Sequence, residues 1–154
     1  MAEATAWVLA LDSDLWAAVG EHEMVHMIQM PTVFTVPDAP PYCRQVLRWE
    51  AEIVPVLDLA AWLRGQSARA EPAMVGIFAY QSLTGAGEIS YGGLPLQIIP
   101  ARRKVRDEQA CVLPEQPAGW WRVALACFQD GERPTPILDL SRLFSGALLA
   151  ESAV

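Results

Sequence analysis

The chain has 154 residues, of which 53% are hydrophobic and 19% charged, and its formal net charge is −7. This length suits one domain or two small lobes that share a core, without a disulfide or a metal to hold it together. The negative charge argues against nucleic acid as a partner, because phosphate binding is driven by Lys and Arg contacts. No stretch reaches the roughly 18 apolar residues of a membrane span, so we expect no membrane insertion and partners that are proteins.

The N-terminal segment lacks the features of a secretory signal, because it carries an acidic residue and no basic stretch ahead of an apolar one. We therefore expect a soluble, cytoplasmic protein. The three cysteines, Cys43, Cys111 and Cys127, are odd in number and widely spaced. This pattern favours reduced thiols over a disulfide framework or a zinc site, and we expect neither a metal nor a cofactor.

The first predicted element is a β-hairpin, because apolar residues 6–11 and 15–19 flank a short polar turn. The following segment, 21–30, is ambiguous. Its methionines and isoleucine fit helical spacing, and they also alternate as they would in a strand. We expect one turn of helix followed by a strand. Prolines then predict an ordered, extended loop up to residue 41.

A repeated motif organises the rest of the chain. The segment 53–63 (IVPVLDLAAWL) returns at 133–144 (RPTPILDLSRLF), and Asp58 and Asp139 stand 81 positions apart within it. The apolar run, opened by Pro, predicts a buried strand. The Asp at its end is placed to cap a short helix, which a glycine then closes. These glycines are Gly65 and Gly146.

The repeat predicts two similar lobes related by a pseudo-twofold, since a period of 81 residues in two copies does not suit a solenoid. The polar segment 64–72, with Gly and Pro near its ends, is the predicted joint. We therefore expect one domain over residues 1–154, with approximate lobes at 12–66 and 73–150.

The second half of the chain also contains short apolar segments bounded by turn residues, and its glycines indicate a hairpin around residues 88–91. Short strands at this spacing, with helix only after each Asp, predict an all-β protein of two small barrels or sandwiches. The strands expected in this half are 74–80, 94–99 and 121–128.

Two equivalent aspartates, Asp58 and Asp139, invite comparison with an aspartic-protease dyad, in which two carboxyl groups share a proton. Such enzymes follow the Asp with Thr or Ser and then Gly, whereas Leu-Ala and Leu-Ser follow here. Helix capping is therefore the favoured role. His22 and His26 have the spacing of a helical metal pair, but no Glu-rich or Cys-rich motif accompanies them. We expect no enzyme and no metal site.

The basic run at 102–106 could bind an acidic partner, but such a run is more commonly a solvated strand face or loop. Three tryptophans, Trp49, Trp120 and Trp121, have the large aromatic area that anchors protein interfaces. Packing in the core would explain a tryptophan equally well. The sequence leaves both alternatives open for these residues.

Three segments occur in the order and spacing of a known family: 36–40 (VPDAP), 45–51 (QVLRWEA) and 53–59 (IVPVLDL). The corresponding family motifs are Val-Pro-Asn-Ala-Pro, Gly-Val-Ile-Asn-Leu-Arg-Gly and Ile-Pro-Val-Ile-Asp-Leu. With these segments and the closing copy at 134–144, the chain resembles the CheW-like chemotaxis coupling domain. The resemblance covers nearly the whole chain.

The resemblance implies two small five-stranded SH3-like β-barrel lobes around a shared apolar core, with short helices and no active site. Proteins of this family are adaptors. One lobe binds the regulatory domain of a CheA-type histidine kinase, and a chemoreceptor's helical tip binds near the groove between the lobes. The resemblance thus implies these two partners here, and it directs attention to Val36, Asp38, Arg48 and Glu50 as protein-interaction residues.

The chain also departs from the family pattern. Arg-Trp-Glu-Ala at 48–51 replaces Asn-Leu-Arg-Gly, so a turn glycine is lost, and Glu50 replaces an Arg that meets a receptor carboxylate in the family. Gln45 replaces the glycine that opens the strand. These departures indicate a divergent coupling protein, serving a pilus or another non-flagellar signalling array. The alternatives are an acidic hydrolase that uses the two motif aspartates, and a small-ligand sensor with its site in the inter-lobe cleft.

Overall fold

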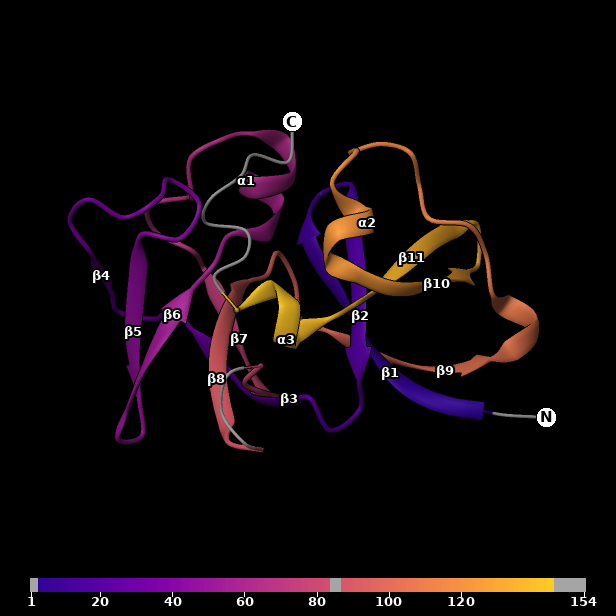
Figure 1. The fold of residues 1–154 in the computed structure, drawn as a ribbon, viewed down its shortest axis with the longest axis horizontal. Coiled ribbons are helices and arrows are strands. Elements are labelled where there is room, and N and C mark those ends of the chain that lie inside the picture. Colours follow the sequence, from indigo (N-terminus) through magenta and orange to yellow (C-terminus); the bar gives the residue numbers. More distant parts are fainter. Residues whose placement is uncertain (1–2, 84–86, 146–154) are drawn as a thin grey trace.

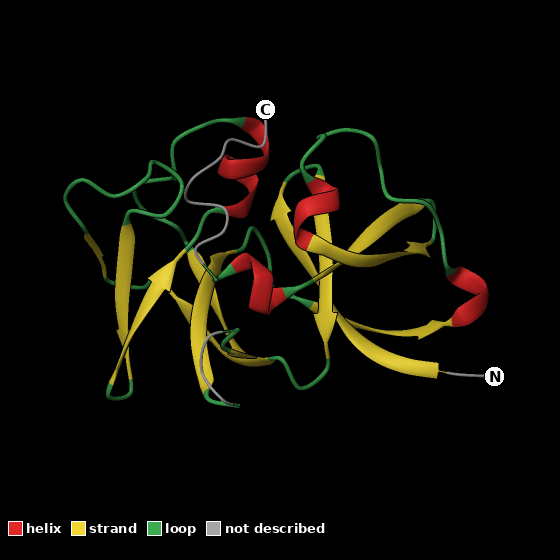
Figure 2. Cartoon of the chain, in the orientation of Figure 1, coloured by secondary structure: helices red, strands yellow, loops and turns green. Residues whose placement is uncertain are grey.

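The computed structural model describes residues 3–83 and 87–145. The chain forms mainly short strands in two curled sheets, with a few short helices, which confirms the predicted all-β class with two lobes (Figures 1 and 2). Within the described ranges one sheet has five strands and the other has six. The additional strand is β4 (Val33–Thr35), a three-residue segment at a sheet edge.

The strands are arranged in the orders β10-β11-β2-β1-β9 and β3-β7-β8-β6-β5-β4. The first sheet contains β1 (Glu3–Asp12), β2 (Leu15–Gly20), β9 (Ala101–Arg106), β10 (Ala124–Asp130) and β11 (Arg133–Leu138). The second contains, besides β4, the strands β3 (Met24–Gln29), β5 (Gln45–Trp49), β6 (Glu52–Val56), β7 (Met74–Gln81) and β8 (Ile89–Pro95). The helices are α1 (Leu59–Arg64), α2 (Trp120–Val123) and α3 (Leu140–Leu143), and the 3₁₀ turn is η1 (Asp107–Gln109).

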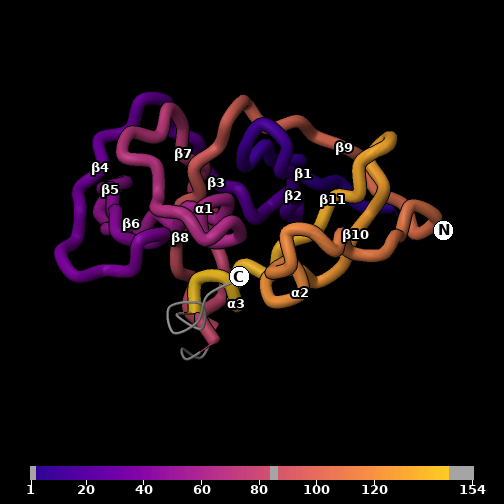
Figure 3. The backbone as a smooth tube through the Cα atoms, turned by 90° about the horizontal axis from the view of Figure 1, so that it is seen from above, coloured from indigo at the N-terminus to yellow at the C-terminus, as the bar shows by residue number. Residues whose placement is uncertain are grey.

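Each sheet takes strands from both halves of the chain. In Figures 1 and 3 the indigo strands β1 and β2 lie with the orange and yellow strands β9, β10 and β11, while β7 and β8 lie with β3–β6. The two sheets therefore do not follow the expected lobe bounds of 12–66 and 73–150, and position 150 lies outside the described residues. The segment 64–72 joins α1 to β7 instead of joining two lobes. The physical reason is that strand pairing is a long-range contact, and β3 crosses to the other sheet directly after β2.

The two halves are nevertheless equivalent in topology. Matching β1, β2, β3, β5 and β6 with β7, β8, β9, β10 and β11 converts one sheet order into the other, apart from β4. The parallel contacts correspond as well, because Ile137 pairs with Ala18 and Val56 pairs with Gly93. The repeat in the sequence thus marks two copies of one unit, and each copy gives strands to the sheet of the other.

A short helix follows the repeated strand in each copy, and the motif aspartates stand at the two helix starts. Asp58 Oδ1 accepts a hydrogen bond from a backbone N–H of α1 at 3.1 Å, and Asp139 Oδ1 accepts one from α3 at 3.2 Å. These bonds satisfy N–H groups that have no partner inside the helix. Gly65 ends α1 with a φ of 65°, in the left-handed region that glycine adopts freely. The second expected helix-closing residue, Gly146, lies outside the described residues.

The main apolar core lies between the sheets and is completed by the capped helices. Trp62 of α1 and Leu143 of α3 are buried in it, together with Leu9 of β1 and Phe78 of β7. Because the cluster contains residues from both sheets, the two sheets share one core. Replacing a buried Trp by Ala typically costs about 3–5 kcal/mol, so Trp62 is a principal contributor to this junction.

Three local predictions differ from the structure. Residues 24–29 form the strand β3 without the expected helical turn, because pairing with β7 decides between the two periodicities. The strand expected at 94–99 ends at Pro95 and begins earlier, at Ile89. The strand expected at 121–128 starts only at Ala124, after the short helix α2.

Candidate interaction surface

The strands β5 and β6 have one buried face and one exposed face. Side chains alternate along a strand, so Leu47 and Val54 are buried, while Arg48 and Ile53 point outward. Ile53 pairs with Arg48 and is 65% exposed. Phe34 of β4 is 57% exposed. We call this surface the outer β5 face and define it as Phe34, Val46, Arg48, Ile53 and Pro55.

The strand register brings these side chains next to one another. Phe34 pairs with Val46, and Val46 pairs with Pro55 across β5 and β6. Apolar side chains that adjoin on the surface mark interaction sites, whereas scattered ones need no explanation. A cavity of about 390 Å³ borders the face and is lined by Ile28, Met30, Pro31, Thr32, Phe34, Leu47 and Arg48.

The four expected interaction residues are all exposed, and they fall into two groups. The backbone N–H of Val36 donates to the carbonyl of Arg44 at 2.7 Å, which places Val36 and Asp38 beyond the start of β5. Arg48 and Glu50 lie at the other end of this strand. Five strand residues span roughly 17 Å, so the two groups do not form one compact site.

Glu50 occupies the tip of the hairpin between β5 and β6. Trp49 pairs with Glu52, which leaves Glu50 and Ala51 as the two loop residues. Glu50 has a φ of 55°, in the left-handed region where glycine is favoured and other residues are strained. Glu50, where the family has an Arg, therefore carries an exposed carboxylate on a strained backbone position, one residue before the lost turn glycine.

The sequence left open whether Trp49, Trp120 and Trp121 pack in the core or anchor a protein interface, and the surroundings of the three residues differ. Trp49 is half-buried, with its ring centroid 6.0 Å from that of His26 and 5.1 Å from that of Tyr91. Trp120 is buried in the main core, and Trp121 is 67% exposed. Of the three, Trp121 alone therefore presents most of its surface to a partner.

Asp58 is bound to Arg69 as well as to α1. Arg69 Nε lies 3.0 Å from Oδ2 of Asp58, its Nη2 lies 3.2 Å from Oδ1, and its backbone N donates to Oδ2 at 3.1 Å. Both carboxylate oxygens are thus engaged, and the side chain is buried. A protease dyad needs a carboxyl group that can share a proton with a second one. The geometry therefore does not support the hydrolase alternative.

Arg69 and Gln45 together fix the segment 64–72, a role that was not predicted for either residue. Gln45 is buried, and its Nε2 donates to the carbonyls of Arg69 and Ala70 at 3.1 and 2.9 Å. Arg69 Nη2 also donates to the carbonyl of Leu11 at 2.8 Å. The sequence offered one signal for this role, which is the position of Gln45 at the start of an apolar strand. A buried amide needs hydrogen-bond partners, so a Gln at such a position indicates a contact with another segment.

The basic run at 102–106 forms the strand β9, and each of its four cations lies near an acidic side chain. The pairs are Arg102 with Glu21, Arg103 with Asp130, and Lys104 and Arg106 with Glu3. The hydrogen bond from Arg106 lowers the pKa of Glu3. Exposed pairs of this kind contribute little stability, but they offset the positive charge of the run. This arrangement favours the solvated strand face over a basic docking patch.

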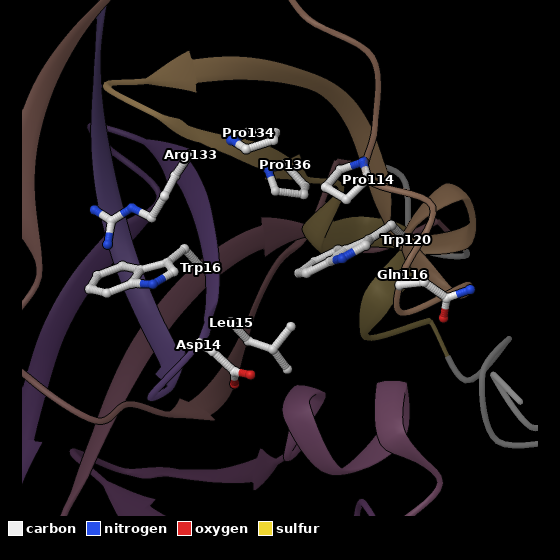
Figure 4. Close-up of a pocket in the computed structure, with 9 residues that line it drawn as sticks. All are labelled: Asp14, Leu15, Trp16, Pro114, Gln116, Trp120, Arg133, Pro134 and Pro136. Carbon is white, nitrogen blue, oxygen red and sulfur yellow. The ribbon is translucent and has the colours of Figure 1, made fainter.

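A second cavity, of about 410 Å³, lies beside β2 and β11 (Figure 4). The Arg133 guanidinium lies 3.7 Å from the centre of the Trp16 ring and 3.5 Å from Asp130. The Arg133 cation is thus already engaged, and the lining comes from β2, β11, the turn before β2 and the 114–120 region, with no residue from the six-stranded sheet. The cavity gives no support to a ligand site in the inter-lobe cleft. Its lining residues are Asp14, Leu15, Trp16, Pro114, Gln116, Trp120, Arg133, Pro134 and Pro136.

Residues 3–83 and 87–145 contain no group of three or more His, Cys, Asp or Glu side chains placed to hold a metal ion. The possible pair of His22 and His26 required a helix, whereas His26 lies in a strand. Over the same residues, no helix has the length and apolar character needed to span a membrane.

The comparisons with known proteins agree with this geometry. The sequence model of the CheW-like domain matches residues 11–148. No curated protein matches the chain. Among solved structures, the scaffolding protein TtCheW from Thermoanaerobacter tengcongensis is similar, with a TM-score of 0.69 and 14% sequence identity, over 94% of this chain and 89% of that chain. This similarity shows the fold.

Proposed function

Because this chain belongs to the CheW-like domain family, we propose that it is a non-catalytic adaptor that couples a receptor to a CheA-type histidine kinase. The family supports a scaffold or coupling role in chemotaxis-like signalling. The similar solved protein is itself described as a scaffolding protein. The two proposed partners are the kinase and the receptor, and the kinase binds on the outer β5 face.

The observation that carries this proposal is the outer β5 face itself. Ile53 and Phe34 leave more than half of their surface exposed on an ordered sheet, with Arg48 between them and Glu50 at the hairpin tip. Protein interfaces take most of their binding energy from a few buried apolar, aromatic or Arg side chains, surrounded by a polar rim. A flat apolar sheet with adjacent charges suits a folded protein domain as its partner.

The test is a binding titration with the regulatory domain of the CheA-type kinase from the same cells. Ile53→Asp should weaken binding by 100-fold or more, because a charge would be buried where an apolar anchor is lost. Leu125→Asp is the matched control, since Leu125 is 69% exposed on β10 of the other sheet and should leave binding unchanged. Equal binding by both variants would refute this kinase site.

The proposed receptor contact involves Glu50, where the family has an Arg. Like charges that face each other across an interface disfavour the wrong partner and so determine specificity. We therefore propose that the natural receptor offers Lys or Arg to Glu50, in a pilus-linked or other non-flagellar array. The adaptor would act in the cytoplasm, where the kinase and the receptor tip meet.

A further inference from the structure

Two cysteines that are distant in the sequence lie side by side. The Sγ atoms of Cys111 and Cys127 are 3.1 Å apart, about 1 Å longer than a disulfide bond. The backbone N–H of Cys111 also donates to the carbonyl of Cys127 at 3.0 Å. This hydrogen bond holds the two residues opposite each other, so the sulfurs can come within bonding distance through small side-chain movements.

The pair lies where the five-stranded sheet closes on itself. The edge strands of that sheet are β9 and β10. The segment after β9 and η1 reaches β10 through a bridge between Ala110 and Phe128. Gln109 adds a hydrogen bond from Nε2 to the carbonyl of Gln129 at 3.1 Å. Cys111 and Cys127 are the next residues along this closing contact, so a bond between them would link the two edges covalently.

The two thiols differ in their surroundings. Cys127 is 4% exposed, and burial together with its contact to Cys111 raises its pKa to about 12. Cys111 is only half-buried. Cys127, together with Arg106 and Ala110, also lines a surface cavity of about 240 Å³ beside β9 and β10. Cys111 is therefore the thiol that meets a reagent first, and Cys127 is placed to react with it next.

We propose that Cys111 and Cys127 form a reversible intramolecular disulfide when the protein meets a two-electron oxidant of the peroxide class. The Cys111 thiol first releases its proton to solvent. The thiolate attacks one peroxide oxygen, the O–O bond breaks, and a sulfenic acid and hydroxide are formed. The hydroxide takes up the released proton and becomes water. The Cys127 sulfur then attacks the Cys111 sulfur, and the S–O bond breaks. The departing hydroxide takes the Cys127 proton and leaves as water. In total, one hydrogen peroxide is reduced to two waters, and two thiols are oxidised to one disulfide.

A small dithiol reductant reverses the step by thiol–disulfide exchange. In the oxidised state the β9 and β10 edges are held together by a bond that closes a short loop. A crosslink of this loop length should raise the midpoint of thermal unfolding by roughly 5–10 °C in a protein of this size. Oxidation should therefore stabilise the five-stranded sheet, with no other covalent change in the protein.

The experiment treats the purified, reduced full-length protein with one equivalent of hydrogen peroxide and then alkylates the remaining thiols. We expect the protein mass to fall by two hydrogens, the alkylatable thiols to fall from three to one, and a peptide linking Cys111 to Cys127. Cys43→Ala should still form the bond. Cys111→Ser should not form it, and because Cys111 is half-buried this variant is expected to fold.

The thermal midpoint of the oxidised protein should return to the reduced value on addition of dithiothreitol. Cys111→Ser should show no such redox-dependent shift. Three alkylatable thiols after peroxide would overturn the proposal. So would a link through Cys43, a crosslink between two molecules, or oxidation of Cys111 to the sulfinic acid without loss of Cys127.

Discussion

Arg69 contacts both carboxylate oxygens of Asp58, whereas Asp139, the equivalent residue of the second copy, accepts its hydrogen bond from the backbone of Arg142. The two copies of the motif thus share the helix cap and differ in the ion pair. Asp58 is also the more buried of the two aspartates. The first copy therefore carries a structural function that the repeat alone does not reveal.

Asp58→Asn should destabilise the protein by about 2–4 kcal/mol, because it breaks a buried ion pair and leaves the Arg69 cation without its partner. Asp139→Asn should cost about 1 kcal/mol or less, since Asn is itself a good helix cap. Urea unfolding of both variants would measure the difference. Equal losses would mean that Arg69 contributes little. Each variant should keep the binding partners of the parent protein, as expected for a scaffold and not for a hydrolase.

Gly92→Ala should destabilise the protein by about 1–3 kcal/mol through overpacking. A Cβ atom at Gly92 would lie 2.5 Å from the ring of Phe144, which stacks on Tyr80 with 5.2 Å between ring centroids. The double variant with Phe144→Leu should lose less than the sum of the two single variants, because the smaller side chain relieves the clash. Additive losses in chemical denaturation would contradict this explanation.

Glu50→Gly should stabilise the protein by up to about 1 kcal/mol, because glycine adopts a positive φ without the strain that Glu50 bears. Ala51→Gly is the matched control in the same loop, where φ is not positive and extra chain freedom should be neutral or unfavourable. Thermal unfolding of the two variants would give the comparison. A loss of stability in Glu50→Gly would show that the side chain makes a compensating contact.

The repeat predicted more of the fold than any single element did. Identical apolar patterns before Asp58 and Asp139 demand the same surroundings, and the two strands indeed take equivalent places in the two sheets. The exchange of strands between the halves could not be predicted, because local pattern does not specify a distant pairing partner. For the same reason β3 was ambiguous, since it is an edge strand whose sides are only partly buried.

The candidate surface was only partly accessible from the sequence. The resemblance to a known family pointed to Arg48 and Glu50, but Phe34 and Ile53 emerged only from the pairing register that makes them neighbours on one face. The contact of Arg69 with Asp58 depends on how the 64–72 segment folds back, which composition does not encode. Sequence identified charged positions, whereas the structure was needed to find their apolar neighbours.

The charge of Glu50 leads to a prediction about receptor choice. In the proposed receptor contact, a standard receptor tip would offer a carboxylate to position 50, so Glu50 would set like against like, which costs up to several kcal/mol where the contact is desolvated. Glu50→Arg should bind a standard tip at least tenfold more tightly than the parent, and it should bind a tip adapted to Glu50 more weakly. Surface plasmon resonance with both tips would measure these changes.

Two further variants separate charge from position in this experiment. Glu50→Gln keeps the turn while removing the charge, so its affinity for the standard tip should lie between those of the parent and Glu50→Arg. Glu52→Arg adds the same positive charge two residues away, on the exposed side chain that pairs with Trp49, and should change the affinities little. If Glu50→Arg left both affinities unchanged, Glu50 would lie outside the interface. The proposed receptor contact would then be wrong, while the outer β5 face would remain a separate site for the kinase.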